Sequence, residues 1–375
     1  MIPELIKPGD EISAGKEFEK AIPEQTDVLV IGGGPAGLSA AIEAAGYGAS
    51  VVLADENARL GGQLYKQIHK FFGSQSHYAG TRGFEIAKLL INKAEDLGVK
   101  LCPNTRALGI LDNGRTALLD LSGDRTAAKQ TIEAKTVILA SGAKENALVF
   151  PGWTLPGVMG AGAAQTFANI HGVLVGKKIL VVGSGNVGLI VSYQLMQAGA
   201  EIAGIVEAAQ KIGGYLVHAG KVRRAKVPIY TGHTIVRAEG TEHVTGAVIA
   251  KVDERFSPVP GTEEHIDCDT ILLAVGLSPR TELAELFTIP LTREKTLGGN
   301  IPVHDESMQS PVKGIFVAGD LAGVEEASTA MDEGRLAGLN AAKACGYPVP
   351  ENRDEELKKS LMLIREGIRK QREEK

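Results

Sequence analysis

The stretch Asp27-Val28-Leu29-Val30-Ile31-Gly32-Gly33-Gly34-Pro35-Ala36-Gly37 decides the fold of this chain. Its apolar run is typical of a buried strand, and residues 38–45 are helical in character. In such a strand–turn–helix unit, one glycine makes the tight turn, one lets the backbone approach a pyrophosphate, and one lets the helix pack on the strand. The stretch therefore predicts a dinucleotide-binding unit.

A second glycine fingerprint, Gly183-Ser184-Gly185-Asn186-Val187-Gly188, follows the apolar run 178–182 and leads into a helical segment, 189–197. In both copies the next predicted strand ends in an acid, Asp55 or Glu207. Both acids lie about 20 residues beyond the last glycine, where a carboxylate can accept hydrogen bonds from an adenosine ribose. The chain is therefore expected to bind two dinucleotides.

Composition excludes several classes of function. A length of 375 residues with 44% hydrophobic and 23% charged residues predicts about two soluble globular domains. A net charge of -5 and a pI near 6.0 provide no electrostatic footprint for nucleic acid. No apolar run reaches the roughly 20 residues of a transmembrane helix, and residues 1–25 contain no apolar signal-peptide core. A cytoplasmic location is expected.

The three cysteines, Cys102, Cys268 and Cys345, are far apart in the sequence, and none belongs to a Cys-x-x-Cys pair. A thiol–disulfide relay needs two thiols within reach of each other, so the sequence argues against one. The eight histidines are scattered, and no Ser-His-Asp set or metal-ligand cluster is evident. We therefore expect no metal site and no catalytic side chain.

Later segments define the domain organisation. The predicted strand 137–140 ends in Ser141-Gly142-Ala143, and a proline- and glycine-rich linker, 149–158, precedes the second unit. A late predicted strand, 314–320, ends in Gly319-Asp320 and is followed by a helix over 328–344. We expect this strand and helix to return to the first sheet, which otherwise lacks a closing element. The expected domains are an N-terminal arm (1–25), a discontinuous first domain (26–148 and 288–346), an inserted second domain (149–287) and a charged C-terminal helix (347–375).

The C-terminal segment carries an apolar stripe. Leu357, Leu361, Ile364 and Ile368 recur at helical spacing and fall on one face. The pattern leaves open whether this face packs on the chain's own body or on a partner protein.

Together, these motifs resemble the two-dinucleotide flavoprotein superfamily. The resemblance implies an α/β fold with two Rossmann-like domains, an FAD domain with an inserted NAD domain, like the pyridine nucleotide-disulfide reductases but without their redox cysteine pair. In that superfamily the aspartate matching Asp320 meets the flavin ribityl chain, and the N-terminus of the next helix, here Ala327, Ser328 and Thr329, points at the flavin pyrimidine ring. A helix N-terminus stabilises negative charge there. The segment Leu60-Gly61-Gly62-Gln63-Leu64 also matches a flavin-side segment.

The resemblance therefore implies FAD in the first domain and NAD(H) in the second. The carboxylate of Glu207 repels a 2′-phosphate and so favours NAD(H) over NADP(H), although Lys211 nearby acts in the opposite direction. The expected cofactor-binding residues are Gly32, Gly34, Pro35, Ala36, Gly37, Asp55, Glu56, Gly62, Gln63, Ala107, Ser141, Gly142, Gly319, Asp320, Ala327, Ser328, Thr329, Gly183, Gly185, Asn186, Val187, Gly188, Glu207 and Gly276.

The linker specifies a branch of the superfamily. Residues 145–159, followed by 161–165, resemble the flavin subunits of opine oxidases, dye-linked proline and hydroxyproline dehydrogenases, hydrogen cyanide synthase and the sarcosine oxidase alpha chain. The resemblance implies an electron-transfer subunit that exchanges hydride between FAD and NAD(H), and electrons with a partner flavoprotein subunit that oxidises an amine or imino acid. Three dispersed cysteines cannot hold an iron–sulfur cluster, so any cluster belongs to a small iron–sulfur partner.

Three alternatives remain open at this stage. The chain could be an oxidoreductase component that accompanies glycerol-3-phosphate dehydrogenase, a stand-alone NADH oxidase or quinone-type reductase, or a structural subunit with ATP in its second site. The substrate, the second nucleotide, the electron acceptor and the stoichiometry are not specified by the sequence.

Overall fold

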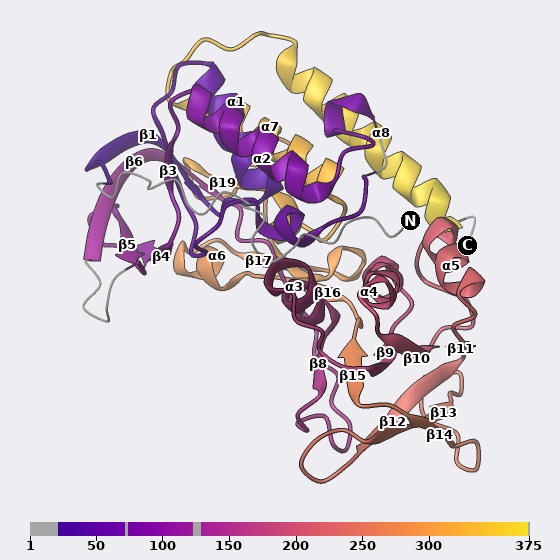
Figure 1. Ribbon diagram of the computed structural model, residues 1–375. Coiled ribbons are helices and arrows are strands. Elements are labelled where there is room, and N and C mark those ends of the chain that lie inside the picture. Colours follow the sequence, from indigo (N-terminus) through magenta and orange to yellow (C-terminus); the bar gives the residue numbers. More distant parts are fainter. Residues whose placement is uncertain (1–21, 72–73, 123–128, 374–375) are drawn as a thin grey trace. The chain divides into compact units, whose positions relative to one another are not determined.

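The computed structural model describes residues 22–71, 74–122 and 129–373, and the chain divides into two units (Figure 1). We call 22–144 with Ser278–Arg369 the N-terminal unit, and Glu145–Leu277 the inserted unit. The short strands β7 (Ala143–Glu145) and β16 (Leu277–Pro279) carry the chain out of the N-terminal unit and back into it. Most of the predicted N-terminal arm lies outside the described residues.

The N-terminal unit is built on a sheet in the order β3-β2-β1-β6-β5-β4, with β19 paired to β6. Strands β3, β2, β1, β6 and β19 are parallel, and β5 and β4 add an antiparallel end. Val28, Leu29 and Val30 are fully buried, as expected for a parallel strand covered on both faces. The strands are β1 (Gln25–Ile31), β2 (Val51–Ala54), β3 (Lys100–Cys102), β4 (Thr105–Ile110), β5 (Thr116–Asp120), β6 (Lys129–Leu139) and β19 (Ile315–Val317).

The late strand and helix return to the first sheet, as the sequence predicted. Strand β19 pairs with β6 in parallel, with Ile315 opposite Val137. The helix after it, α7, packs closely on α1, because a Cβ on Gly334 would lie only 2.1 Å from the carbonyl oxygen of Ala36. The helices of this unit are α1 (Pro35–Gly46), α2 (Gly83–Asp96), α6 (Glu282–Leu286), α7 (Ala327–Ala344) and α8 (Arg353–Glu373).

Smaller elements complete the N-terminal unit. Its short 3-10 turns are η1 (Gly62–Lys66), η2 (Gln75–His77), η3 (Lys295–Leu297) and η4 (Gly319–Leu321). A hairpin of β17 (Leu291–Glu294) and β18 (Gly299–Pro302) lies between α6 and β19 in the chain.

The inserted unit repeats the plan with a parallel sheet in the order β11-β10-β9-β15-β8. Its strands are β8 (Val158–Gly160), β9 (Lys178–Val182), β10 (Glu201–Glu207), β11 (Ile229–Thr231) and β15 (Thr270–Leu273). Its helices are α3 (Ala161–His171), α4 (Asn186–Gln197) and α5 (Leu216–Arg224), and an antiparallel sheet contains β12 (His233–Glu239), β13 (Gly246–Lys251) and β14 (Glu264–Asp267) (Figure 1). The predicted fold class is confirmed.

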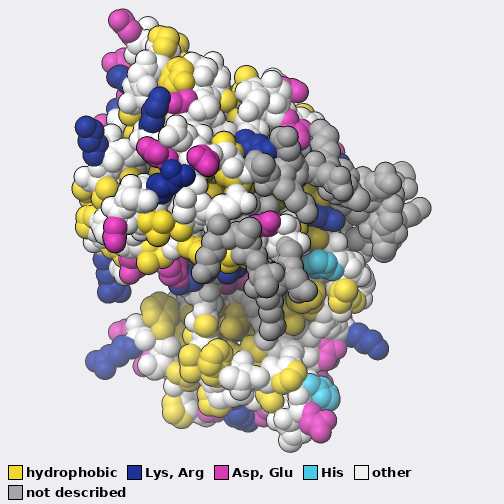
Figure 2. Space-filling view, turned by 90° about the vertical axis from the view of Figure 1, so that its left-hand side faces the viewer, with side chains coloured by type: hydrophobic (Ala, Val, Ile, Leu, Met, Phe, Trp, Pro, Cys, Tyr) yellow, Lys and Arg dark blue, Asp and Glu magenta, His cyan; other side chains and the backbone are white. Residues whose placement is uncertain are grey.

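The C-terminal segment forms helix α8, which runs along the helical layer of the N-terminal unit (Figure 1). Leu357, Leu361 and Ile368 of its apolar stripe are 3%, 6% and 8% exposed, so the stripe docks on the chain's own body. Within the described residues, no helix is long and apolar enough to cross a bilayer. Figure 2 shows acidic and basic side chains interspersed over the described residues of the face drawn, and these residues form no basic patch there.

Candidate functional site

The first glycine turn connects β1 to α1 and tolerates no side chain at its closest points. Gly32 has a φ of 110°, and a Cβ there would lie 2.2 Å from the carbonyl oxygen of Ala140. A Cβ on Gly37 would lie 1.8 Å from the carbonyl oxygen of Gly32. By contrast, the nearest atom to a Cβ on Gly34 is 3.9 Å away. The turn is therefore closely packed at Gly32 and Gly37 and open at Gly34, where a pyrophosphate can approach the protein backbone.

Helix α1 presents its N-terminus at this opening. Its N-cap is Gly34, whose lack of a side chain leaves the first amide groups without a capping hydrogen bond, and Pro35 begins the helix. The first turn contains no acidic residue. Free N–H groups at an uncompensated positive end of a helix are suited to a phosphate group.

Asp55 is held against the turn by its own hydrogen bonds. It is 7% exposed, and Oδ2 accepts the Gly33 N–H at 2.6 Å. Oδ1 accepts the backbone and side-chain N–H groups of Asn57 at 2.7 and 2.9 Å. These bonds fix the carboxylate at the carboxyl end of β2, which is the position of the ribose-binding acid in dinucleotide folds.

The Gly61-Gly62 pair lies directly on the same turn. The Gly61 N–H donates to the Gly33 carbonyl oxygen at 2.7 Å. Gly62 has a φ of 52°, and a Cβ there would lie 2.8 Å from the Cα of Gly34. Only glycine fits this approach, and the exposed Gln63 follows it at the start of η1.

Gly319 and Asp320 reach the first turn of α1 from the far end of the sequence. Gly319 has a φ of 71°, and a Cβ there would lie 2.6 Å from the Cβ of Ala36. Burial raises the pKa of the Asp320 carboxyl to about 6, while a hydrogen bond from the backbone of Glu325 lowers it. The structure thus brings together the glycine turn, the Gly-Gly pair and the late aspartate, which the sequence keeps far apart.

The start of α7 contains a buried hydroxyl without a partner. Thr329 is 1% exposed, and its Oγ1 makes no hydrogen bond within the described residues. The N-cap, Glu326, provides no side-chain cap, and the first turn contains no acid. An unpartnered buried hydroxyl at an uncapped helix N-terminus suits a polar, electron-rich ligand group, so these residues fit the pyrimidine end of a flavin.

The other expected residues of this unit lie at strand ends. Ala107 is on β4, and Ser141 and Gly142 follow β6, where the Ser141 hydroxyl donates to the Arg280 carbonyl oxygen at 3.0 Å. The carboxylate of Glu56 accepts hydrogen bonds from Arg280 and Arg106 at 2.8 and 3.0 Å. The Arg280 guanidinium lowers the pKa of Glu56 more than any other group, so this acid stays ionised.

The inserted unit contains a second site of the same design. Cβ atoms on Gly183 and Gly188 would each lie 2.2 Å from a backbone oxygen, that of Ala274 and that of Gly183 respectively. A Cβ on Gly185 would meet nothing within 4 Å, and this glycine caps α4, whose first residues are Asn186 and Val187. Gly276, with a φ of 104°, follows β15 in the same unit.

Glu207 is fixed in the same way as Asp55. Its Oε2 accepts hydrogen bonds from Ser184, from the backbone N–H at 2.9 Å and from the hydroxyl at 2.6 Å. Its Oε1 accepts the Ala209 N–H at 2.9 Å. The carboxylate is therefore presented at the end of β10, beside the second residue of the glycine turn.

Sequence reasoning missed the Gly213-Gly214 pair. The Gly214 N–H donates to the Ser184 carbonyl oxygen at 2.8 Å, and the Tyr215 N–H donates to Oδ1 of Asn186 at 2.8 Å. The segment Ile212-Gly213-Gly214 repeats Leu60-Gly61-Gly62 at the same distance after its acid. That internal repeat was the available signal, and it shows that the duplicated plan extends beyond the glycine turns.

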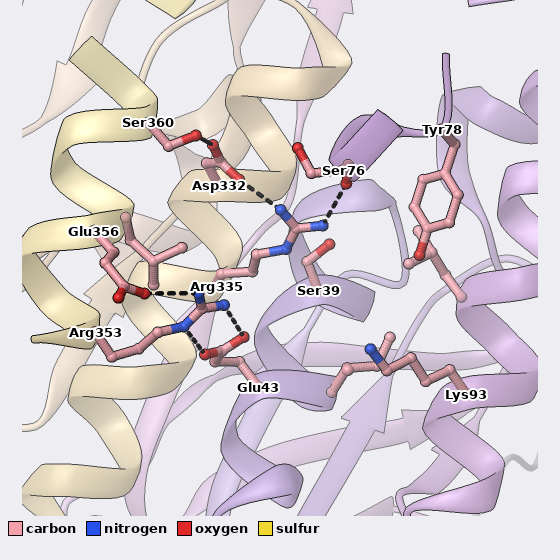
Figure 3. A pocket seen from close by; sticks show the side chains of 13 residues that line it. Ser39, Glu43, Ser76, Tyr78, Lys93, Asp332, Arg335, Arg353, Glu356 and Ser360 are labelled. Atoms are coloured by element: carbon pink, nitrogen blue, oxygen red, sulfur yellow. Dashed lines mark hydrogen bonds and ion pairs between the residues drawn. The ribbon is translucent and has the colours of Figure 1, made fainter. Parts of the chain in front are cut away.

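Residues of α1, α2, η2, α7 and α8 also line a cavity of about 300 Å³ (Figure 3). Several of its charged side chains form ion pairs: Arg353 with Glu43 at 2.9 Å, and Arg335 with Asp332 at 2.7 Å. Ser39 Oγ lines the cavity without a hydrogen-bond partner among the described residues. In the part of the chain that the structure describes, no group of three or more His, Cys, Asp or Glu is placed to hold a metal ion.

The raised pKa of Asp320 predicts a pH-dependent effect of Asp320→Asn on the apoprotein. Below about pH 3 the carboxyl is protonated in both the folded and the unfolded chain. Above about pH 6 the folded protein must ionise this half-buried acid, so stability falls as pH rises from about 4 to about 6. The asparagine variant avoids this cost, and we expect it to be about 1–2 kcal/mol more stable at pH 8.

Urea unfolding of the two apoproteins at pH 4 and pH 8 measures this difference. The stability gain is expected to be several-fold smaller at pH 4, because the folded carboxyl is then protonated and the unfolded one is only partly ionised. A gain of equal size at both pH values would mean that the substitution acts through packing and not through ionisation.

Comparison with known proteins places this geometry in a family. Residues 26–334 match the family described as pyridine nucleotide-disulphide oxidoreductase. An opine oxidase subunit of Agrobacterium tumefaciens (strain Ach5) is 31% identical over 84% of this chain and 65% of that protein. Hydrogen cyanide synthase subunit HcnB of Pseudomonas aeruginosa is 30% identical over 83% of this chain and 70% of that protein.

Two solved structures share the fold. Thioredoxin reductase of T. acidophilum superposes with a TM-score of 0.68 at 21% identity, covering 86% of this chain and 99% of that one. L-proline dehydrogenase from P. horikoshii also has a TM-score of 0.68 at 24% identity, covering 93% of this chain and 60% of that one. The chain spans only 65% and 62% of the length of two of the opine oxidase subunits that it matches.

Proposed function

Because the chain belongs to the pyridine nucleotide-disulphide oxidoreductase family, we propose that it is the FAD- and NAD(H)-binding electron-transfer subunit of a multi-subunit dehydrogenase. In this proposal the partner is a flavoprotein subunit that oxidises an amine or imino acid, and a small iron–sulfur protein serves as a further carrier. The names of the relatives support a subunit role, since two of them are subunits of opine oxidase and hydrogen cyanide synthase.

The observation that carries the proposal is that the three cysteines provide no redox-active dithiol pair. Cys102 and Cys345 belong to the N-terminal unit and Cys268 to the inserted unit, and none forms a disulfide. Burial raises the pKa of Cys102 to about 11 and that of Cys268 to about 12, and it also raises the pKa of Cys345. Such thiols are poor nucleophiles at neutral pH. The chain has both glycine turns but no dithiol pair. In this proposal the electrons of the reduced flavin therefore pass to a partner subunit and not to a disulfide.

When bound, FAD would supply a carrier that exchanges a hydride with NAD(H) and passes electrons to the partner. In the N-terminal unit, the first amide groups of α1 would hold its pyrophosphate and the Asp55 carboxylate its adenosine ribose. Asp320 would accept hydrogen bonds from the ribityl chain. The N-terminus of α7 would stabilise negative charge at the pyrimidine ring, as a positive helix end does.

In the inserted unit, the same kinds of groups would hold NAD(H). The amide groups at the start of α4 face the opening at Gly185, and the fixed carboxylate of Glu207 would accept hydrogen bonds from the ribose hydroxyls. A 2′-phosphate in that position would meet a carboxylate, which favours NAD(H) over NADP(H). The protein's contribution to catalysis is positioning, which can supply several kcal/mol of the barrier reduction.

The experiment is native purification at endogenous abundance, with mass spectrometry of the co-purifying chains and of the nucleotides released on denaturation. We expect FAD, a nicotinamide nucleotide and a second flavoprotein subunit. The protein alone should reduce oxygen or quinones slowly with NADH, and the partner should restore fast turnover on an amine or imino acid.

Each alternative gives a different result. Fast NADH turnover by the protein alone would favour a stand-alone oxidase or quinone reductase. ATP in place of NAD(H) would favour a structural role for the inserted unit. Co-purification with glycerol-3-phosphate dehydrogenase would replace the proposed substrate class.

A further inference from the structure

Helix α7 contains a fully buried acid, Glu333, close to the proposed flavin site. It is 1% exposed, and its Oε2 accepts the Gly319 N–H at 2.8 Å. Its Oε1 accepts a hydrogen bond from Nη2 of Arg365 on α8 at 2.5 Å. Burial raises the pKa of Glu333 to about 8, while the Arg365 guanidinium lowers it, so the charged form of this acid depends on its arginine partner. Glu333 thus connects the C-terminal helix to the backbone of the residue before Asp320.

Arg365 also pairs with a second glutamate, Glu325. Nε of Arg365 donates to Oε2 of Glu325 at 2.8 Å, and the backbone N–H of Glu325 donates to the Asp320 carboxylate. One guanidinium therefore pairs with two glutamates, of which Glu333 is hydrogen-bonded to Gly319 and Glu325 to Asp320. The planar fork of arginine suits this double contact, which a lysine ammonium cannot reproduce with the same geometry.

We propose that Arg365 is a positioning residue of the flavin site, which holds Gly319 and Asp320 against the first turn of α1 through Glu333 and Glu325. The C-terminal helix is then part of the cofactor site and not only a cover for the apolar layer. This inference rests on the proposed binding of FAD by the N-terminal unit. The ion pairs of Arg365 are with the two glutamates, so its effect on FAD must pass through them.

A second arginine of α8 provides a matched control. Arg353 docks the first turn of the same helix on α1 through Glu43 at 2.9 Å and also pairs with Glu356 on α8 (Figure 3). Within the described part of the chain, its hydrogen bonds reach neither Gly319 nor Asp320. Loss of Arg353 therefore weakens the docking of α8 without touching the flavin segment.

The test compares the full-length Arg365→Gln, Arg365→Lys and Arg353→Gln proteins with the wild type. For each we would measure the Kd for FAD by reconstitution of the apoprotein, the absorption spectrum of bound flavin, its midpoint potential, and Tm. Arg365→Gln is expected to raise the Kd at least tenfold and to shift the flavin spectrum and potential, and Arg365→Lys should restore part of each. Arg353→Gln should lower Tm while leaving the Kd, spectrum and potential at wild-type values.

The proposal is overturned if Arg365→Gln and Arg353→Gln lower Tm alike and leave Kd and spectrum unchanged. If Arg365→Gln does not fold, Arg365→Lys is compared with Arg353→Lys, and only the former should raise the Kd, by about threefold. Equal Kd values for these two lysine variants would also overturn it. A wild-type protein that takes up no FAD would instead refute the proposed function, so the two failures are distinguishable.

Discussion

The Gly37→Ala protein is expected to emerge from purification largely colourless. The added Cβ would lie 1.8 Å from the carbonyl oxygen of Gly32 and 3.2 Å from Cγ1 of Val30. The nearest atom belongs to the backbone, so α1 must move away from β1, and the amide groups at its N-terminus move with it. Overpacking of this kind costs about 1–3 kcal/mol, which corresponds to roughly a 10- to 100-fold loss of FAD affinity.

FAD titration of the apoprotein, followed by flavin fluorescence, measures the loss. The control is Gly46→Ala, at the other end of α1, where a Cβ would meet nothing within 4 Å. Alanine favours helix over glycine, so this variant should bind FAD normally and gain slightly in stability. If both variants bound FAD equally well, the first turn could not be the pyrophosphate site.

The Gly188→Ala protein is expected to remain yellow but to lose its second nucleotide. The new Cβ would lie 2.2 Å from the carbonyl oxygen of Gly183 and 3.2 Å from the Cβ of Ala274. Helix α4 must therefore shift relative to β9, and NADH affinity should fall by roughly 10- to 100-fold. The N-terminal unit has its own sheet and core, so FAD occupancy should not change.

Equilibrium binding of NADH to the FAD-loaded protein gives the measurement. Gly220→Ala, in α5 of the same unit, is the matched control, because its Cβ would approach only the flexible end of the Arg224 side chain at 3.7 Å. Retention of full NADH affinity in Gly188→Ala would exclude the second turn as the nucleotide site. Loss of FAD together with NADH would show instead that the two units do not fold independently.

Both glycine turns could be recognised from the sequence because their physics is local. The requirements for a tight turn, a close backbone approach and helix packing fall within a few residues, at Gly32 to Gly37 and at Gly183 to Gly188. The acids Asp55 and Glu207 follow at a spacing set by one strand–helix–strand unit. The same locality should have revealed Gly213-Gly214, since it repeats Gly61-Gly62 at the same distance after its acid.

The sequence left the position of α8 open between its own body and a partner. An amphipathic pattern says which face is buried but not what covers it. Leu357 and Leu361 are buried within the chain, and Arg353 pairs with Glu43 of α1, far away in the sequence. Where α8 docks depends on the shape and charge of the surface that α1 and α7 form together. A local sequence pattern does not specify that surface.

By itself, the amino-acid sequence determined the α/β class, the two nucleotide turns with their acids, and the absence of a cysteine pair suited to a dithiol relay. Only the tertiary structure decided that Gly319 lies against Ala36 and that Arg365 joins Glu325 to Glu333. The physical reason is that a turn is specified by the conformations and contacts of neighbouring residues. The contacts among α8, α7 and α1 depend instead on how whole helices pack. That packing decides which charged side chain lies beside a buried charge and can pair with it.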